Sequence, residues 1–216
     1  MPIGSTSCCR IGGPRAADTL RVMATKSPVR RKAPQHVYQL RIELQHIAPA
    51  VWRRIVVPET LTLVKLDRVI QAAMGWTNSH LHEFRIADGR YGIPDGEWPD
   101  DAMLDERRFT IGQLLSVGVK QFEYSYDFGD GWDHVIEVEN QLPVVANRNT
   151  WPMCIAGENA CPPEDVGGPP GYMDFIEAMG STTHPQHGDM WIWWGAPFDA
   201  AGFSLNDANI AIRNLR

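Results

Sequence analysis

The sequence predicts an α+β fold, in which an antiparallel or mixed β-sheet packs with about four helices in a single domain. Three observations support this class. Apolar and polar residues alternate with a period of two over residues 122–138. Residues 38–44 and 51–57 alternate in the same way, and strands this close in sequence most simply pair antiparallel. Helical spacing over residues 63–74 ends at Gly75, a residue type favoured just beyond helix C-termini.

The first half of the domain contains three predicted strands and one helix. Pro49 separates the first two strands, and Thr62 is a suitable N-cap for the helix. Residues 76–86 end in a predicted third strand, one face of which carries His80, His82, Phe84 and Ile86. Residues 88–107 are rich in glycine, proline and acids, which predicts a solvated loop.

The second half is organised around a predicted hairpin. A short helix from Thr110 to Gly118 precedes it. The hairpin turn is Gly129-Asp130-Gly131, flanked by Phe122, Tyr124, Tyr126 and Phe128 on one side and by Trp132, His134, Ile136 and Val138 on the other. Then follow a long irregular connection, a helix, an apolar segment and a last helix capped by Ser204 and Asp207, at residues 141–171, 172–180, 190–194 and up to Leu215.

The composition is that of an ordinary globular protein. Hydrophobic residues make up 44% and charged residues 21% of the 216 positions. No apolar run reaches the roughly 20 residues of a membrane helix, and no secretory signal is recognisable. Four cysteines, two of them adjacent at Cys8 and Cys9, do not form a disulfide framework. We expect a cytoplasmic protein with reduced thiols and no membrane partner.

The net charge of −6 is unevenly distributed. Residues 1–36 carry seven Lys or Arg against one acid, Asp18, so this segment is +6 and the remainder is −12. The breaker-rich composition predicts a disordered leader, or a natural start further along at Met23, and places the domain at residues 37–216. The alternative is a basic arm that contacts nucleic acid.

Several ordered motifs carry a more specific signal. They are I-A-P-A-V-W-R-R at Ile47–Arg54, A-A-M-G-W at Ala72–Trp76, S-H-L-H-E-F at Ser79–Phe84, Y-D-F-G-D-G-W-D-H at Tyr126–His134, C-P-P-E-D-V-G-G at Cys161–Gly168, G-Y at Gly171-Tyr172 and P-F-D at Pro197–Asp199. In this order and spacing the chain resembles the plasmid pRiA4b Orf-3-like family. The resemblance implies an α+β fold and a bacterial protein encoded in some cases on plasmids or insertion elements. It implies no specific activity, and Val166 stands where members often have cysteine.

The histidines form one candidate metal site. Alternate residues of a strand point the same way, so His80 and His82 present two imidazoles on one face, and His134 is a third candidate ligand. Asp127, Asp130 or Glu83 would supply oxygen, and a divalent ion such as zinc bound there would activate water. The alternative is that these histidines are hydrogen-bonded core residues. Cys154 and Cys161 are weaker zinc candidates, because they lack the C-x₂-C spacing.

A second candidate site is the loop surface around the hairpin turn. It comprises Asp127, Asp130, Trp132, His134, Glu164, Asp165 and Arg53. Either Arg53 or Arg54 is the predicted ion-pair partner of the Glu164-Asp165 pair. Such a surface would contact a protein or peptide partner.

Three functions follow from these features. The first is a non-enzymatic binding or accessory protein associated with plasmids or mobile elements. The second is a metal-dependent, phosphoesterase-like hydrolase that uses the histidine and carboxylate site. The third is a DNA-associated factor of transposable elements that acts through the basic leader. None of the common nucleotide-binding or hydrolase motifs is present in the sequence, which favours the first.

Overall fold

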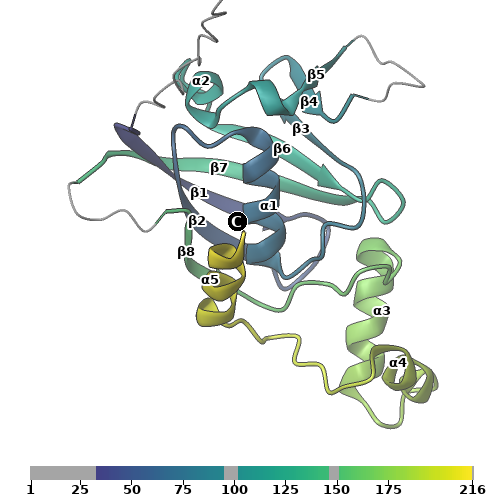
Figure 1. The fold of residues 1–216 in the computed structure, drawn as a ribbon. Coiled ribbons are helices and arrows are strands. Elements are labelled where there is room, and N and C mark those ends of the chain that lie inside the picture. Colours follow the sequence, from purple (N-terminus) through teal and green to yellow (C-terminus); the bar gives the residue numbers. More distant parts are fainter. Residues whose placement is uncertain (1–32, 95–101, 146–150, 216) are drawn as a thin grey trace, which may run out of the picture. The chain divides into compact units, whose positions relative to one another are not determined.

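The domain is built on a mixed β-sheet flanked by helices, as the sequence predicts (Figure 1). The computed structural model describes residues 33–94, 102–145 and 151–215. From Ala33 onward these residues form one compact unit. Of the predicted leader, residues 1–32 lie outside the described part, and His36 is the first residue of the first strand.

Eight strands and five α-helices occur within the described residues. The strands are β1 (His36–Leu44), β2 (Trp52–Pro58), β3 (His82–Ile86), β4 (Gly89–Gly92), β5 (Met103–Asp105), β6 (Gln121–Tyr126), β7 (Trp132–Pro143) and β8 (Met153–Glu158). The helices are α1 (Leu63–Met74), α2 (Ile111–Leu115), α3 (Gly168–Gly180), α4 (His187–Trp194) and α5 (Leu205–Asn214), with a 3₁₀ turn η1 (Glu106–Arg108).

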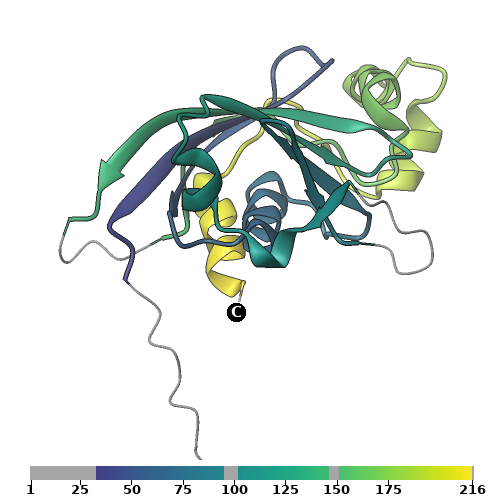
Figure 2. The same ribbon diagram turned by 90° about the horizontal axis from the view of Figure 1, so that it is seen from above.

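The strand order is β5-β4-β3-β6-β7-β1-β2-β8. Every neighbouring pair is antiparallel except β4 with β5, which is parallel. Figure 2 shows the strands curving over α1 and α5, which lie together on one face of the sheet. Both views place α3 and α4 at the side of the sheet, away from the face that α1 covers.

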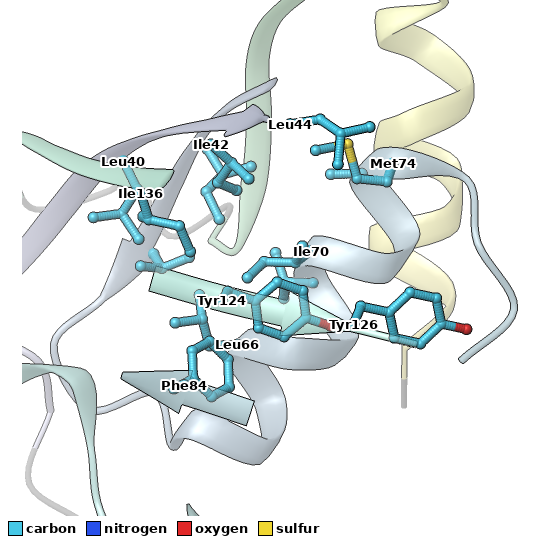
Figure 3. Packing of buried hydrophobic residues seen from close by; sticks show 14 of the residues in the cluster. Leu40, Ile42, Leu44, Leu66, Ile70, Met74, Phe84, Tyr124, Tyr126 and Ile136 are labelled. Carbon is cyan, nitrogen blue, oxygen red and sulfur yellow. The ribbon is translucent and has the colours of Figure 1, made fainter. Parts of the chain in front are cut away.

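The core lies between this helix-covered face and α1, and the period-two alternation explains it. Alternate residues of β1 point inward, while Gln39, Arg41 and Glu43 lie on the opposite, partly exposed face. On that face the Arg54 guanidinium donates two hydrogen bonds of 2.6 Å to the Glu139 carboxylate. Figure 3 shows the buried side chains that meet in the core, among them Leu40, Ile42, Leu44, Leu66, Ile70, Met74, Phe84, Tyr124, Tyr126 and Ile136.

Helix α1 has the predicted limits. Thr62 is the N-cap in extended conformation, although its side chain makes no capping hydrogen bond. At the other end Gly75 adopts φ +110°, and its N–H donates to the Gln71 carbonyl at 2.8 Å. This left-handed glycine ends the helix and releases Trp76 in a new direction.

Two segments that the sequence analysis assigned to loops contain regular structure. The predicted solvated loop at 88–107 holds β4, β5 and η1, and Glu106 within it is completely buried. The predicted connection at 141–171 holds the end of β7, all of β8 and the start of α3. Three- and four-residue strands are too short for alternation to be recognised, and β8 reads Met-Cys-Ile-Ala-Gly-Glu, with no period of two. The acids at positions 95–101 lie outside the described residues.

None of the described helices combines the length and the apolarity needed to cross a bilayer.

Ile70 tests the packing of α1 against the sheet. Its side chain is fully buried, so Ile70→Ala leaves a cavity and should lower the free energy of unfolding by about 2–5 kcal/mol. Ile210 on α5 is 44% exposed, and Ile210→Ala is the matched control with an expected change within about 0.5 kcal/mol. Urea denaturation measures both, and equal effects would contradict this description of the core.

Candidate functional site

Three segments far apart in the sequence meet at one end of the β6–β7 hairpin. We call residues 76–81, 127–131 and 161–168 the loop junction. The Trp76 indole donates to the Pro162 carbonyl at 2.9 Å, and the Asp127 N–H donates to the Leu81 carbonyl at 2.9 Å. The Gly167 N–H donates to the Asp130 carboxylate at 3.2 Å. The structure therefore joins the two motifs that the sequence analysis combined into one surface.

The two glycines of the third segment permit this approach. Gly168 adopts φ +70°, and a Cβ placed on it would lie 2.3 Å from the Asp130 carbonyl oxygen. Asp127 and Asp165 also have left-handed backbones, with φ +53° and +57°. Non-glycine residues adopt this conformation at an energetic cost, and such residues concentrate at functional sites.

His80 lies at the centre of the loop junction. Its Nε2 atom is 3.3 Å from Asp165 Oδ1, 3.6 Å from Asp127 Oδ2 and 4.0 Å from Glu164 Oε2. Among the described residues, His80, Asp127 and Asp165 form the one group of three potential metal-ligand side chains whose donor atoms converge. One predicted ligand thus lies beside carboxylates that the sequence analysis had named.

Glu164 forms hydrogen bonds with residues next to it at the loop junction and pairs with none of the described arginines. One of its oxygens, Oε1, accepts hydrogen bonds from the Thr77 N–H at 2.8 Å and from the Thr77 hydroxyl at 3.0 Å. The Tyr126 hydroxyl donates to the same carboxylate at 3.1 Å. The predicted ion pair between Arg53 or Arg54 and the Glu164-Asp165 pair is not formed, because Arg54 points to the other face of the sheet and Arg53 binds carbonyls.

Arg53 is a buried cation held by backbone groups. Its Nε donates to the Ala73 carbonyl at 2.9 Å, and its Nη1 donates to the Trp52 and Glu158 carbonyls at 2.8 and 2.9 Å. The Phe203 ring covers the guanidinium at 4.3 Å. Among the described residues, no carboxylate lies within ion-pair distance of it. Burial lowers the pKa of Arg53, and the negative C-terminal end of α1 at Ala73 partly offsets its charge.

Arg53 also lines a cavity of about 830 Å³. The cavity lies between the end of α1, the loop 160–164 and helices α4 and α5. Its walls are mainly apolar and include Met74, Trp76, Pro162, Pro163, Trp193, Trp194, Phe198 and Phe203. The volume and the apolar lining are typical of ligand-binding cavities. From the sequence, residues 190–194 were described as an apolar segment, and they were not placed beside the end of α1 and the loop 160–164.

His82 belongs to a separate, buried cluster. Its Nε2 is 2.7 Å from Glu106 Oε2, and its Nδ1 is 3.3 Å from Asp67 Oδ1. The Tyr124 hydroxyl donates to Asp67 at 2.7 Å and accepts from the Gln71 amide at 2.9 Å. Burial disfavours the imidazolium, but the hydrogen bond to Glu106 and the charge of Asp67 raise the pKa of His82 overall. Burial raises the pKa of Asp67.

This arrangement joins β3, α1, η1 and β6 through one imidazole. Both ring nitrogens of His82 face carboxylates, so the ring does not share a ligand position with His80. Asp67 and Glu106 were not among the functional residues predicted from the sequence. Asp67 carried a usable signal, because a carboxylate adjoins Leu66 on the apolar face of α1, whereas Glu106 lay in a segment assigned to solvent.

His134 and Trp132 are core residues of β7. The His134 Nδ1 contacts the Tyr124 carbonyl at 3.1 Å, and its ring meets Trp76 edge-on at 5.4 Å. The structure therefore does not bring His80, His82 and His134 to a common point. Trp132 is fully buried. A direct contact between Trp132 and a partner, which the loop-surface hypothesis expected, is thus wrong for the folded protein.

The two described cysteines lie near Arg53 as free thiols. Burial raises the pKa of both, so they are held as thiols rather than as the thiolates that bind zinc. The Cys154 thiol donates to the Ala156 carbonyl at 3.3 Å. Neither cysteine joins a histidine in a converging group of ligands among the described residues. Glu83, the other oxygen candidate, forms ion pairs with Arg85 and Arg90.

Gly168 tests the close approach at the loop junction. Gly168→Ala places a Cβ against the Asp130 backbone at positive φ, so it should lower the free energy of unfolding by about 1–3 kcal/mol or more. Gly188 in α4 has open space around it, and Gly188→Ala should be neutral or stabilising because alanine favours helix. Thermal denaturation compares the two, and equal destabilisation would contradict the contact.

Because His134 is buried, we expect the free energy of unfolding of the protein to decrease in acid. Burial lowers its pKa in the folded protein from 6.5 to about 4, so the unfolded chain binds one more proton between these pH values. The contribution of His134 to the free energy of unfolding is fully present above pH 6.5. It falls by about 3 kcal/mol as the pH decreases toward 4. The raised pKa of His82 acts in the opposite direction, so wild type is compared with His134→Phe, which retains His82.

The measurement is the free energy of unfolding at pH 7 and at pH 4.5 for both proteins. Wild type should lose more stability than His134→Phe over this interval. His184→Phe, which changes a partly exposed histidine between α3 and α4, should behave like wild type. Equal losses in wild type and His134→Phe would contradict a neutral, buried His134.

With the geometry in place, three comparisons identify the relatives of this chain. The sequence profile of the plasmid pRiA4b ORF-3-like protein family matches residues 36–207. The uncharacterized protein y4hQ of Sinorhizobium fredii (strain NBRC 101917 / NGR234) is 44% identical over 181 residues, which cover 83% of this chain and 92% of that protein. The crystal structure of the protein of unknown function MM3350 from Methanosarcina mazei Go1 superposes with a TM-score of 0.74 at 32% identity, covering 81% of this chain and 98% of that one. The resemblance seen in the ordered motifs is thereby confirmed, and the chain belongs to the plasmid pRiA4b ORF-3-like family.

Proposed function

We propose that this protein is a non-enzymatic binding module that holds an apolar segment of a protein partner in the cavity beside Arg53. The observation that carries the proposal is the cavity itself, with its volume of about 830 Å³ and its aromatic walls. Trp193 and Phe203 are residue types that contribute strongly to binding energy when a partner excludes water from them. The family name, which refers to a plasmid, supports an accessory role for such a module in plasmids or mobile elements.

A protein partner is favoured over a small molecule because the apolar surface continues beyond the cavity. Trp191, Ile192, Trp193 and Trp194 follow one another in α4, and each exposes between 39% and 80% of its surface. Helix α4 has no buried residue. A helix that exposes several large apolar residues in one turn supports a protein interaction site at this end of the cavity.

Arg53 adds a preference for a negative group. Its charge is buried and lacks a carboxylate partner among the described residues, so a carboxylate that enters the cavity would form a charge-assisted pair in a poorly solvated place. The proposed partner segment therefore carries a carboxylate, either a side chain or the chain terminus, beside its apolar residues. Cys161 lines the same cavity, and because burial raises its pKa it is held as a thiol and is not an activated nucleophile.

The test is selection of binding peptides from a random library with free C-termini, followed by affinity measurement with a fluorescent peptide. The double substitution Trp193→Ala and Trp194→Ala should weaken binding by at least about tenfold, as expected for aromatic residues at the centre of an interface. Val117 is 78% exposed and lies outside the cavity, so Val117→Ala is the control and should bind as wild type.

Two results would overturn the proposal. One is an unchanged affinity of the selected peptides for the double variant. The other is a stable dimer of the wild-type chain in sedimentation experiments that the double variant loses, because a second copy would then cover this surface.

A further inference from the structure

We propose that His80, Asp127 and Asp165 bind one divalent transition-metal ion, with zinc as the best match, and that Glu164 lies beside it. The inference does not depend on the proposed partner binding. It rests on the distances between the donor atoms, on an unsatisfied nitrogen and on the way the backbone holds the donors.

The donor spacing matches a metal site. Zinc binds nitrogen and oxygen ligands at about 2.0–2.2 Å in a tetrahedron, whose edge is then roughly 3.4 Å. The His80 Nε2 atom lies 3.3 Å from Asp165 Oδ1 and 3.6 Å from Asp127 Oδ2, on either side of this value. All the donor atoms of the group lie within 4.8 Å of one another. Small side-chain rotations would bring them around one ion.

The His80 ring supplies an independent indication. Its Nε2 atom is buried and has no hydrogen-bond partner, although the rest of the side chain is partly exposed. A buried nitrogen without a hydrogen-bond partner lowers the stability of the fold, so such an atom indicates a bound water or ion. The nitrogen points at carboxylate oxygens, so a cation between them would satisfy both kinds of atom.

Asp127 is already held in the required orientation. Its Oδ1 accepts from the Gly129 N–H at 3.0 Å, while Oδ2 is the oxygen directed to His80. Its left-handed backbone and the hydrogen bond from its N–H to Leu81 fix the carboxylate close to the histidine loop. Supporting contacts of this kind orient metal ligands in proteins.

The donor set determines the class of ion. One imidazole nitrogen with two or three carboxylate oxygens suits zinc or manganese, whereas calcium and magnesium prefer oxygen ligands alone. Zinc is expected to bind more tightly than manganese at a site with a nitrogen ligand. The competing explanation is that His80 contacts the same carboxylates directly, without a metal ion.

The experiment is calorimetric titration of the chelator-treated full chain with zinc chloride and, separately, manganese chloride. We expect one zinc ion per wild-type chain and weaker binding of manganese. His80→Ala and Asp127→Asn should lose this binding, and asparagine tolerates the left-handed backbone at position 127. His184→Ala removes a histidine of similar exposure outside the junction and should bind as wild type.

The melting temperature gives a second measurement of zinc binding. Zinc should raise the melting temperature of wild type and of His184→Ala but not of His80→Ala, with circular dichroism confirming that each variant folds. The absence of zinc binding by wild type would overturn the proposal. So would zinc that remains bound to His80→Ala but is lost on substitution of Cys8 and Cys9 by serine, because the adjacent thiols would then be the ligands.

Discussion

The packing of α1 against the curved face of the sheet is the constraint on which the other features depend. Leu66 and Ile70 bury the helix against the aromatic residues of β6, so the end of α1 has a defined position. Arg53 binds the carbonyl at that end, and Gly75 turns the chain away from it. The cavity and the loop junction both begin at this point, because Trp76 lines the first and belongs to the second.

Polar groups inside this core are paired, which explains how an apolar face tolerates them. His82 lies between Asp67 and Glu106, and the three side chains join segments that are distant in sequence. Buried ion pairs contribute little net stability, since desolvation opposes their attraction, but removal of one partner leaves an uncompensated charge. Such a cluster restricts how β3 and η1 can dock on α1. His134 differs, because burial without a charged partner favours its neutral form.

The elements with strong periodicity were predicted correctly from the sequence, whereas the short ones were not. β1, β2, α1 and the hairpin follow alternation or helical spacing over six or more residues, and local side-chain preference and burial agree in them. β4, β5 and β8 gain their strand conformation from neighbours in the sheet rather than from their own residues. Glu106 shows the same limit, since its burial depends on His82, which is 24 positions away.

For the site, the sequence by itself determined which residue types were available, and it assigned His80 and Asp127 to one candidate site and Asp127, Glu164 and Asp165 to another. Only the tertiary structure decided their grouping. In the folded chain His80 lies beside two carboxylates, whereas His82 and His134 are buried in the core. The cavity is lined by residues of three helices and a loop. The physical reason is that strand spacing specifies which face a side chain takes, whereas contacts between loops depend on left-handed residues such as Asp127 and Gly168, whose positions follow from how the whole chain packs.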